Sequence, residues 1–448
     1  MNRREFLTHS GIALAGATQL STFGRMAHAA PGGDYCAMVC ILLAGGADSF
    51  NMLVPFDDDR YNEYAGVRSD LALPQGDLLE LNYAGAGGAQ FGVHPGMGEV
   101  QSLFNGGDLA FIANIGPLAE PTTRAAYDAG TASLPLGLFS HSDQIAVWQT
   151  SAAGVRVNTG FAGRIADVLE PRIETGPVSM NISMSGTSLF QTGDQITGYV
   201  MDPAEGVREV AGYGDGTEPF APVIDSLLAL DFNDPFRQTY ARVLRDAIDS
   251  GAELSAALQG VPAFTTVFSD TEFSTAMQQI ANVISVRESL GVERQTFFVT
   301  VGGWDHHDEV LNNQANMLPG ISQGLSEFHS ALTELGMLNN VTTFTISDFG
   351  RTLTSNGRGS DHGWGGNLMV MGGAVNGGQI FGDYPTLALG TELDLGRGRF
   401  LPTTSTDEFY GDLALWFGID PSELSIALPN IGRFFDTGGG GTPLGIFA

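Results

Sequence analysis

Uninterrupted apolar runs recur along the chain, and segments with a helical spacing of apolar positions separate them. The runs cover residues 38–44, 109–115, 296–301, 341–346 and 368–371. A strand that is buried on both faces needs apolar side chains at consecutive positions, and the strands of parallel sheets are buried in this way. These runs therefore predict strands of one largely parallel sheet.

The segments between the runs predict helices. Apolar residues lie three and four positions apart in residues 236–258, 274–290 and 321–335. Ser405 and Glu408 have the spacing of a capping box at the start of a further helix. Strands that alternate with helices predict an α/β fold, a doubly wound and mostly parallel sheet with helices on both faces.

The first 29 residues have the features of an export signal. Arg3 and Arg4 are followed by Phe and Leu, then by a weakly apolar run over residues 11–23 and a small-x-small cleavage pattern at 27–29. A paired arginine in this setting is typical of signals that the twin-arginine export machinery reads. We therefore expect a periplasmic or secreted protein and exclude residues 1–29 from fold reasoning.

Residues 30–448 are predicted to form a single α/β domain. No stretch beyond the signal has the ~20 consecutive apolar residues that a membrane helix needs, so a soluble mature protein is expected. Residues from about 165 to 270 are more acidic and contain fewer strand-like runs. An insertion over the sheet and an extra helical layer are both left open for this segment.

The charge composition restricts the partners. The formal net charge is −30, and the cationic side chains are all Arg. Such a surface repels nucleic acid and anionic lipid at low salt, and it suits a saline environment in which charge is screened. An anionic substrate would therefore need local positive charge, supplied by metal ions or by a well-placed Arg.

The two cysteines predict no disulfide. Cys36 and Cys40 both fall in an apolar run that reads as a strand. Four residues of strand separate their Cα atoms by roughly 13 Å, which is beyond disulfide reach. We expect two buried thiols, with a redox or metal pair as the alternative.

Three carboxylates follow three of the predicted strands. Asp48, Asp305 and Asp348 each come shortly after an apolar run. Ligands of open parallel sheets bind beyond the carboxyl ends of the strands, so these side chains are expected to meet at one edge of the sheet. Repulsion among carboxylates in a partly buried site is costly unless a cation neutralises them.

Imidazoles lie close to these acids in the sequence. His306 and His307 follow Asp305, and a second Asp-His pair stands at Asp361 and His362. Mixed carboxylate and imidazole ligands suit zinc, manganese or iron better than calcium. The sequence therefore predicts a site for a divalent metal, with zinc expected and one or two ions left open. The alternative is that each Asp caps a helix and each His is a packed side chain.

Short motifs in six places resemble a large family of twin-arginine-exported bacterial proteins. That family, DUF1501, is known only as a domain of unknown function, and its layout is similar to that of the alkaline phosphatase and sulfatase superfamily. The resemblance extends over nearly all of the chain after the export signal. The motifs are LAGGADSFNMLVP (43–55), FSHSDQIAVWQ (139–149), GFAGR (160–164), GGWDHH (302–307), SDFGRT (347–352) and DHGWG (361–365).

The resemblance implies an alkaline phosphatase-like fold with two metal ions and in-line attack of a hydroxyl group on a phosphate or sulfate ester. Transferred to this sequence, it assigns Asp305, His307 and His362 to one ion. It assigns Asp48 and Asp348 to the other, and Asp361 is a further candidate ligand.

The resemblance also implies residues that act on the substrate. Ser140 is the candidate nucleophile, followed by His141, and Ser142 and Ser49 remain rivals. Arg351 would bind the non-bridging oxygens in a bidentate manner. Asn51 and Gln144 would orient the substrate.

One departure from the superfamily pattern affects the second ion. Phe349 follows Asp348 where superfamily members often have His, so this ion loses an imidazole unless His141 or another residue replaces it. The predicted function is an exported metal-dependent hydrolase of phosphate or sulfate esters: a phosphatase, phosphodiesterase or sulfatase. The competing interpretation is a non-catalytic exported protein of the same fold, which acts with a partner in cell-surface or extracellular assembly. A formylglycine sulfatase is disfavoured, because neither Cys36 nor Cys40 lies in the motif that this modification needs.

Overall fold

The computed structural model describes residues 35–173, 178–208, 210–214, 216 and 218–448. The predicted export signal therefore lies outside the described residues. No helix in the described part of the chain combines the length and the apolar character needed to span a membrane.

A large central sheet confirms the predicted fold class. Its strands run in the order β11-β5-β10-β9-β1-β8-β6-β7, and β12 pairs with β5. All neighbouring strands are parallel except that β10 runs antiparallel to both β5 and β9. The strands are β1 (Cys36–Leu43), β5 (Leu109–Gly116), β6 (Asn181–Ser183), β7 (Tyr199–Val200), β8 (Arg294–Val301), β9 (Val341–Ser347), β10 (Gly366–Met371), β11 (Ile380–Phe381) and β12 (Thr404–Ser405).

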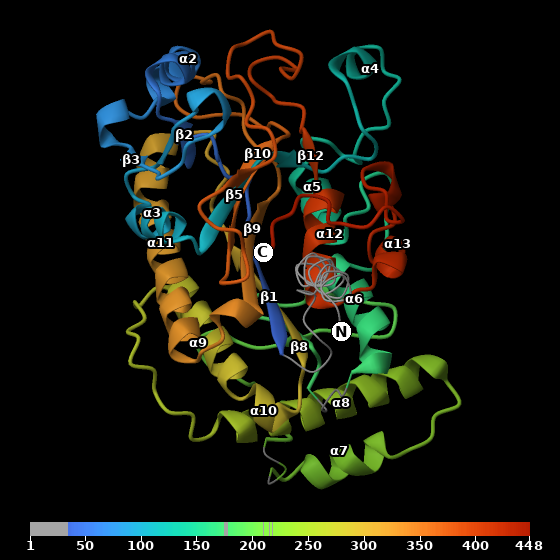
Figure 1. Ribbon diagram of the computed structural model, residues 1–448. Helices are drawn as coiled ribbons and strands as arrows, with labels where there is room; N and C mark the ends of the chain where they lie inside the picture. The colour runs from blue at the N-terminus through green and yellow to red at the C-terminus, as the bar shows by residue number, and fades with distance from the viewer. Residues whose placement is uncertain (1–34, 174–177, 209, 215, 217) are drawn as a thin grey trace, which may run out of the picture.

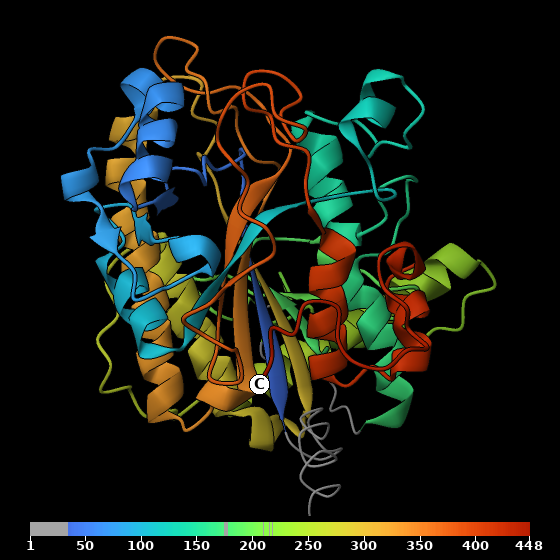
Figure 2. The same ribbon diagram turned by 45° about the horizontal axis from the view of Figure 1, so that its top comes forward.

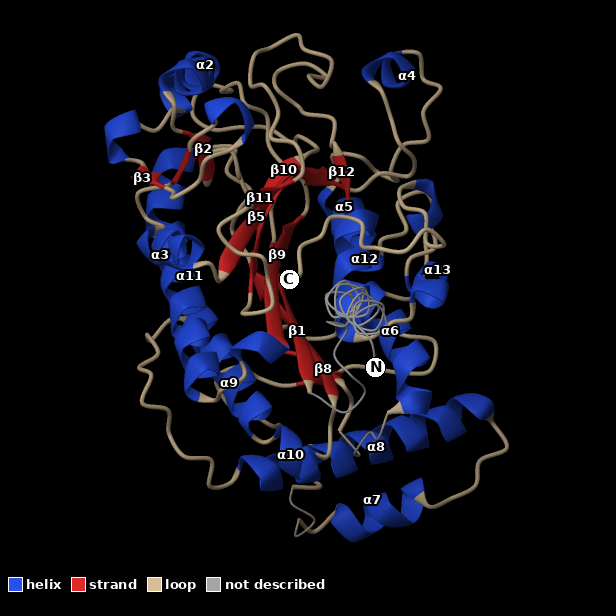
Figure 3. Ribbon diagram, viewed as in Figure 1, coloured by secondary structure: helices blue, strands red, loops and turns tan. Residues whose placement is uncertain are grey.

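Helices cover both faces of this sheet (Figures 1 and 2). Helices α3, α9 and α11 lie on one side, and α5, α6, α12 and α13 lie on the other, as Figure 3 shows. The helices are α2 (Asp58–Arg68), α3 (Gly98–Gly106), α4 (Arg124–Asp128), α5 (His141–Thr150), α6 (Phe161–Leu169), α7 (Ala221–Leu228), α8 (Pro235–Leu258), α9 (Glu272–Ser285), α10 (Arg287–Leu290), α11 (Val310–Glu334), α12 (Thr406–Phe417) and α13 (Leu424–Ala427).

The continuous apolar run of β1 is explained by burial on both faces. Val39 and Ile41 pack into the core beneath α9 and α11, whereas Met38 and Cys40 pack into the core beneath α6 and α12. Because successive side chains of a strand point to opposite faces, a strand covered on both sides needs apolar residues throughout. Cys36 and Cys40 are both buried and form no disulfide, as expected for two thiols in one extended strand.

A small second sheet lies beside the carboxyl end of the central sheet. It has the order β2-β4-β3, with β2 (Leu53–Pro55), β3 (Leu79–Glu80) and β4 (Phe91–Val93) paired in antiparallel fashion. Helix α2 follows β2 and ends at Arg68, whose side chain is buried. The small sheet and α2 together place the guanidinium group of Arg68 near the end of β1.

The capping box predicted from the sequence is present at the start of α12. The Ser405 hydroxyl accepts from the amide of Glu408, and the Glu408 carboxylate accepts from the amide of Ser405. We expect Ser405→Ala to lower the free energy of unfolding by about 1–2 kcal/mol, because it leaves an amide of the first helical turn without an acceptor. Urea denaturation measures this change. Ser102→Ala on the exposed face of α3 is the control, and an equal loss in both variants would contradict the capping role.

A buried carboxylate in α12 gives a pH-dependent prediction. Burial raises the pKa of Asp407 to about 7, well above the ordinary value of ~3.9 for an aspartate carboxyl. A folded-state pKa above the unfolded value means that this group favours folding least at high pH, with the loss developing between about pH 4 and pH 7. We expect Asp407→Asn to raise Tm by a few degrees at pH 8, and the gain to shrink as the pH falls towards 5. The exposed Asp77→Asn is the control, and a gain that does not depend on pH would contradict the assignment.

Candidate metal centre

The carboxyl ends of three parallel strands place the site. Leu43 at the end of β1 is in register with Val301 of β8 and with Ser347 of β9. The loops that follow these strands therefore start side by side, as expected for parallel strands. A tight approach joins them: a Cβ atom on Gly45, which has φ of +125°, would lie 2.4 Å from the backbone nitrogen of Asp305. A glycine is thus required where the loop after β1 meets the loop after β8.

Three imidazoles surround the carboxylate of Asp305. The Nε2 atoms of His307 and His362 lie 3.1 and 3.6 Å from Asp305 Oδ1, and the Nε2 atom of His141 lies 3.5 Å from Oδ2. Ligand atoms of His141, Asp305 and His362 all lie within 4.8 Å of one another, a spacing that could hold a metal ion. The four side chains are partly exposed, so the cluster is open to solvent.

The other nitrogen of each ring is bound to an acceptor. Nδ1 of His141 lies 2.7 Å from Asp348 Oδ2, and Nδ1 of His307 lies 3.1 Å from Asp361 Oδ1. The third contact, of 2.8 Å, joins Nδ1 of His362 to the carbonyl oxygen of Phe139. A carbonyl or carboxylate oxygen accepts, so each Nδ1 carries the proton and the neutral ring presents its Nε2 lone pair to the cluster.

These tautomers make the arrangement suited to a cation. Nε2 of His307 and Nε2 of His362 are 2.9 Å apart. Two unprotonated nitrogens at this separation repel each other, so a proton or a metal ion between them is needed. Metal-binding histidines usually donate their second N–H to a carboxylate or a backbone carbonyl, which is the pattern of all three rings.

Different segments of the fold hold the three rings. His141 is the first residue of α5, and Ser140 is its N-cap. His307 lies in the loop after β8, and His362 lies between β9 and β10, where it forms a β-bridge with Arg351. The cluster therefore exists only in the folded chain, and its geometry depends on helix α5 as well as on the strand ends.

The electrostatics of the cluster favour a neutral His362 and ionised Asp305 and Asp361. Burial lowers the pKa of His362, the hydrogen bond with the carbonyl of Phe139 opposes this shift, and the charge of Arg351 lowers the pKa further. Burial opposes ionisation of Asp305, but the hydrogen bond and charge of Arg351 outweigh it and lower the pKa of this carboxyl. At Asp361, burial is likewise outweighed by hydrogen bonds, from Asn356 and Arg397, which lower its pKa to about 2.

Arg351 is fully engaged with the protein. Its side chain is buried, and it donates to the carbonyl oxygens of Gly46, Ser360 and Gly45 and to the carboxylate of Asp305. The sequence resemblance assigns this side chain to a substrate anion. Here its donors hold the loop after β1 and orient Asp305, so Arg351 positions the cluster.

Asp48 is held in an ion pair away from the imidazoles. Its Oδ2 atom accepts from Arg68 at 2.9 Å and from the hydroxyl of Ser360 at 2.7 Å, and both members of the ion pair are fully buried. The guanidinium group supplies the positive charge that the sequence-based interpretation attributed to a second metal ion. The structure therefore does not bring Asp48 to the cluster.

Asp348 and Asp361 stand behind the imidazoles. Asp348 is fully buried, and its Oδ1 accepts from the amide of Gly45 while its Oδ2 faces His141. Asp361 binds Arg397 and Asn356 in addition to His307. The sequence assigned both acids to metal ions directly, whereas the structure uses them to orient two of the rings.

The two residues expected to orient the substrate are buried. Asn51 donates to the carbonyl of Leu71 and accepts from Tyr64, and Gln144 donates to the carbonyl of Leu136. Neither side chain is exposed. Both side chains pack around the site, and neither lies at its solvent-exposed opening.

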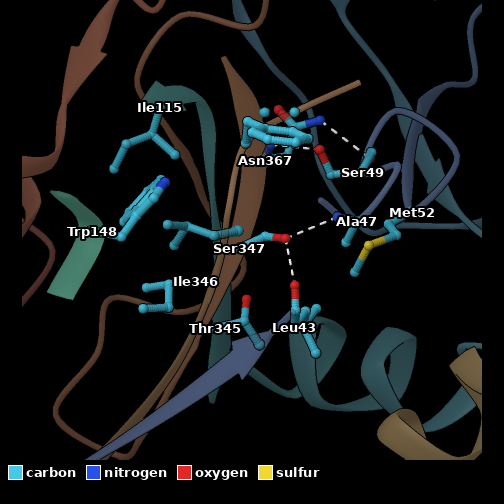
Figure 4. A pocket seen from close by; sticks show the side chains of 14 residues that line it. Leu43, Ala47, Ser49, Met52, Ile115, Trp148, Thr345, Ile346, Ser347 and Asn367 are labelled. Atoms are coloured by element: carbon cyan, nitrogen blue, oxygen red, sulfur yellow. Dashed lines mark hydrogen bonds between the residues drawn. The ribbon is translucent and has the colours of Figure 1, made fainter. Parts of the chain in front are cut away.

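The three candidate nucleophiles differ in access. Ser49 is buried, and its hydroxyl accepts from the amide of Asn367. Figure 4 shows this contact in a small pocket that Trp148 and Ser347 also line. Ser140 and Ser142 lie at the start of α5 beside His141, and their Oγ atoms are 3.5 Å apart. Access therefore favours the two serines of α5 over Ser49.

Phe349 packs against two of the rings, which also contact each other. Its ring centroid lies 4.9 Å from that of His141 and 4.5 Å from that of His362. The residue that replaces an imidazole thus packs against the remaining imidazoles and limits their rotation. The ring of His141 faces Asp305, although His141 lies in a segment of the chain that is distant in sequence from Asp305.

Two parts of the site were not predicted, and a third was predicted only in part. His141 was assigned to catalysis beside Ser140 and named as a possible replacement ligand of the second ion, but nothing in the sequence shows that α5 brings its ring to Asp305. The carbonyl of Phe139 is a backbone group and has no sequence signal. Arg68 lies at the end of a polar helix, where an exposed guanidinium would be the ordinary expectation.

Several solved structures are similar to this chain at low sequence identity. The lipoteichoic acid synthase LtaP from Listeria monocytogenes is 6% identical with a TM-score of 0.34, over 86% of this chain and 72% of that chain. The PsFucS1 sulfatase from Pseudoalteromonas sp. is 9% identical with a TM-score of 0.32, over 86% and 68%. A TAB5 alkaline phosphatase mutant with bound Mg is 9% identical with a TM-score of 0.28, over 75% and 91%. No residue role is transferred from structures this distant.

No curated protein sequence matches the chain. A family model does match, over the segment from α8 to a point shortly after α13. This segment contains Asp305, His307 and His362, whereas His141 lies before it. Residues 233–429 match the family described as "Protein of unknown function (DUF1501)", which confirms the family that the sequence motifs predict.

Proposed function

We propose that the protein is an exported, metal-dependent hydrolase of phosphate or sulfate esters. The observation that carries the proposal is the convergence of three imidazole Nε2 atoms on the carboxylate of Asp305, each ring being anchored through Nδ1. Imidazole and carboxylate donors in this number fit zinc, with manganese and iron as alternatives. His141, Asp305 and His362 would hold the ion, and His307 is placed to complete the set.

The proposal includes one ion. A second ion would need Asp48 and Asp348, but the first is neutralised by Arg68 and the second is occupied by His141 and Gly45. Placing another cation beside the buried guanidinium of Arg68 would be repulsive. The guanidinium group of Arg68 thus takes the place of the second metal ion that the sequence predicted.

A bound divalent ion supplies Lewis acidity, which stabilises negative charge on an ester oxygen or on an attacking hydroxyl. The residues of the chain orient the reaction. Asp348 and the carbonyl of Phe139 fix two rings, and Arg351 fixes Asp305. His141 is the first residue of α5, so the N-terminal end of this helix, which favours an anionic group, lies beside the cluster. Ser140 and Ser142 lie on this same turn and are the hydroxyl groups placed to attack.

Export and partners are part of the same proposal. The paired Arg3 and Arg4 support delivery by the twin-arginine machinery to the periplasm or the exterior. The proposed substrate is a small or polymeric anionic ester, and the net charge of −30 disfavours nucleic acid as a partner. Within this chain, the ion would provide the attraction that an anionic substrate needs.

A second candidate function is metal binding without turnover, in a protein that acts with an assembly partner. One observation favours it: Arg351, Asn51 and Gln144, which were expected to bind the substrate, are all buried and bonded to the protein. Metal content tests both candidates together, and ester hydrolysis separates them.

Metal content is the first test. The purified mature protein is expected to retain a single transition-metal ion per chain, measured by inductively coupled plasma mass spectrometry. Loss of a ligand should weaken binding strongly, so His362→Ala and His141→Ala should each lower zinc affinity at least tenfold while the circular dichroism spectrum is kept. Asp348→Asn should lower it by about 10–100-fold, because this residue orients His141.

His329→Ala is the matched control, because His329 pairs with Asp108 outside the cluster. This variant should keep full occupancy. Unchanged zinc affinity in the His141 and His362 variants would show that the ligand assignment is wrong. Two ions per chain would contradict the role given to Arg68.

Activity is the second test. With zinc bound, the protein is expected to hydrolyse p-nitrophenyl phosphate, bis-p-nitrophenyl phosphate or p-nitrophenyl sulfate. Asp305→Ala should remove this activity, and either Ser140→Ala or Ser142→Ala should reduce kcat by a factor of 100 or more, since one of these hydroxyls attacks. Ser102→Ala on α3 should leave kcat unchanged. A folded, zinc-loaded protein inactive on all three esters would favour the assembly candidate.

A further inference from the structure

The helical hairpin α7–α8 concentrates the exposed apolar side chains of the described part of the chain. Seven of its 13 exposed large hydrophobic residues lie between positions 220 and 243. They follow helical spacings along α7 with its flanking residues and along α8, and so form two adjacent stripes. The seven are Phe220, Val223, Leu227, Leu230, Phe236, Tyr240 and Val243.

An apolar groove runs between these stripes. It is lined by side chains from both helices and from the turn that joins them, among them Leu227, Phe232, Phe236 and Tyr240. Phe236 is 85% exposed and Tyr240 is 70% exposed, values that are unusual for aromatic residues of a helix in an otherwise well-covered protein. The exposed face is therefore a contiguous patch, which marks an interaction site more often than scattered residues do.

Within the described residues, no element covers the exposed apolar face of the hairpin, although α8 also contacts α9 and α10. Helix α7 packs against α8, and the two lie at the end of the molecule away from the carboxyl ends of the strands (Figure 1). Every residue from 233 to 240 is exposed, although α8 becomes buried at Ile248 and Leu254. The outer apolar face of a two-helix layer is buried only when another element packs against that face.

We propose that this face is covered by the same hairpin of a second copy, so that the protein is a twofold-symmetric dimer. In a twofold interface the same patch serves both partners, and two such hairpins form a four-helix arrangement around a shared apolar centre. The seven stripe side chains expose on the order of 800 Å², about the area that each partner contributes to a stable interface.

Charge supports a second copy as the occupant. Arg237 and Arg242 are exposed on α8, and no ion pair joins either one to another described residue. The neighbouring turn carries the exposed acids Asp231 and Asp234. A twofold axis can set these arginines against Asp231 and Asp234 of the second copy, which gives local charge complementarity although each copy is acidic overall. An anionic membrane surface fits less well, because it offers Asp231 and Asp234 no group of opposite charge.

Sedimentation velocity over a hundredfold range of concentration tests the proposal on the purified mature protein. The parent protein is expected to sediment as a dimer that dissociates on dilution. A double variant, Leu227→Asp with Phe236→Asp, should be monomeric at every concentration, because it places charge in the centre of the patch. Arg237→Glu with Arg242→Glu should raise the dimer dissociation constant at least tenfold.

Val267→Asp is the control, since Val267 is 83% exposed but lies outside the hairpin. This variant should dimerise like the parent, and circular dichroism should show that all variants are folded. A parent protein that stays monomeric throughout would overturn the proposal, as would a dimer that survives the Leu227 and Phe236 substitutions. Flotation of the monomer with phosphatidylglycerol vesicles would assign the patch to a membrane surface instead. Zinc content should be the same in all forms, so this test is independent of the proposed activity.

Discussion

The site depends on one constraint, the anchoring of three imidazole rings through their Nδ1 atoms. Asp348, Asp361 and the carbonyl of Phe139 each accept from one ring and so turn the opposite nitrogen towards Asp305. Without these acceptors the rings could exchange tautomers and rotate, and the separation of 2.9 Å between two Nε2 atoms would be unfavourable. The acceptors come from the residue after β9, from the segment before β10 and from the turn before α5. The metal centre is therefore a property of the assembled sheet and helix.

Much of the fold could be predicted because burial on two faces leaves a clear signal in the sequence. The runs that became β1, β5, β8 and β9 are apolar at consecutive positions, and the central helices repeat apolar residues every three or four positions. The same reasoning placed Asp305 at a strand end. It failed where local pattern says little: α11 begins at Val310 rather than near 321, since its first turns are rich in Asn and Gln, and the direction of β10 is set by a tertiary pairing that its own residues do not encode.

The candidate site was predictable only in part for the same reason. The resemblance assigned Asp305, His307 and His362 to one ion, and the structure brings them together. Strand-end reasoning and the resemblance both placed Asp48 at the metal site, and neither could foresee how neighbouring charges would be shared. A buried Arg68 takes Asp48, so a carboxylate expected at an ion is neutralised by the chain itself. Burying such a pair is costly, and removing either partner would leave an isolated charge in the interior. This pair therefore constrains how many ions the site can hold.

The charge of the cluster shows why an ion would matter for an anionic substrate. With neutral imidazoles, the acids and guanidinium groups of the site nearly cancel, and one negative charge remains in excess. On a chain of net charge −30, such a site repels a phosphate or a sulfate ester. A divalent ion reverses the sign of the local charge, whereas no described Arg at the cluster is free to do so. The groups are Asp48, Asp305, Asp348 and Asp361 against Arg68, Arg351 and Arg397. Since all three guanidinium groups are already bound to carboxylates, attraction of the substrate would depend on the ion, and metal loss would be expected to weaken substrate binding as well as catalysis.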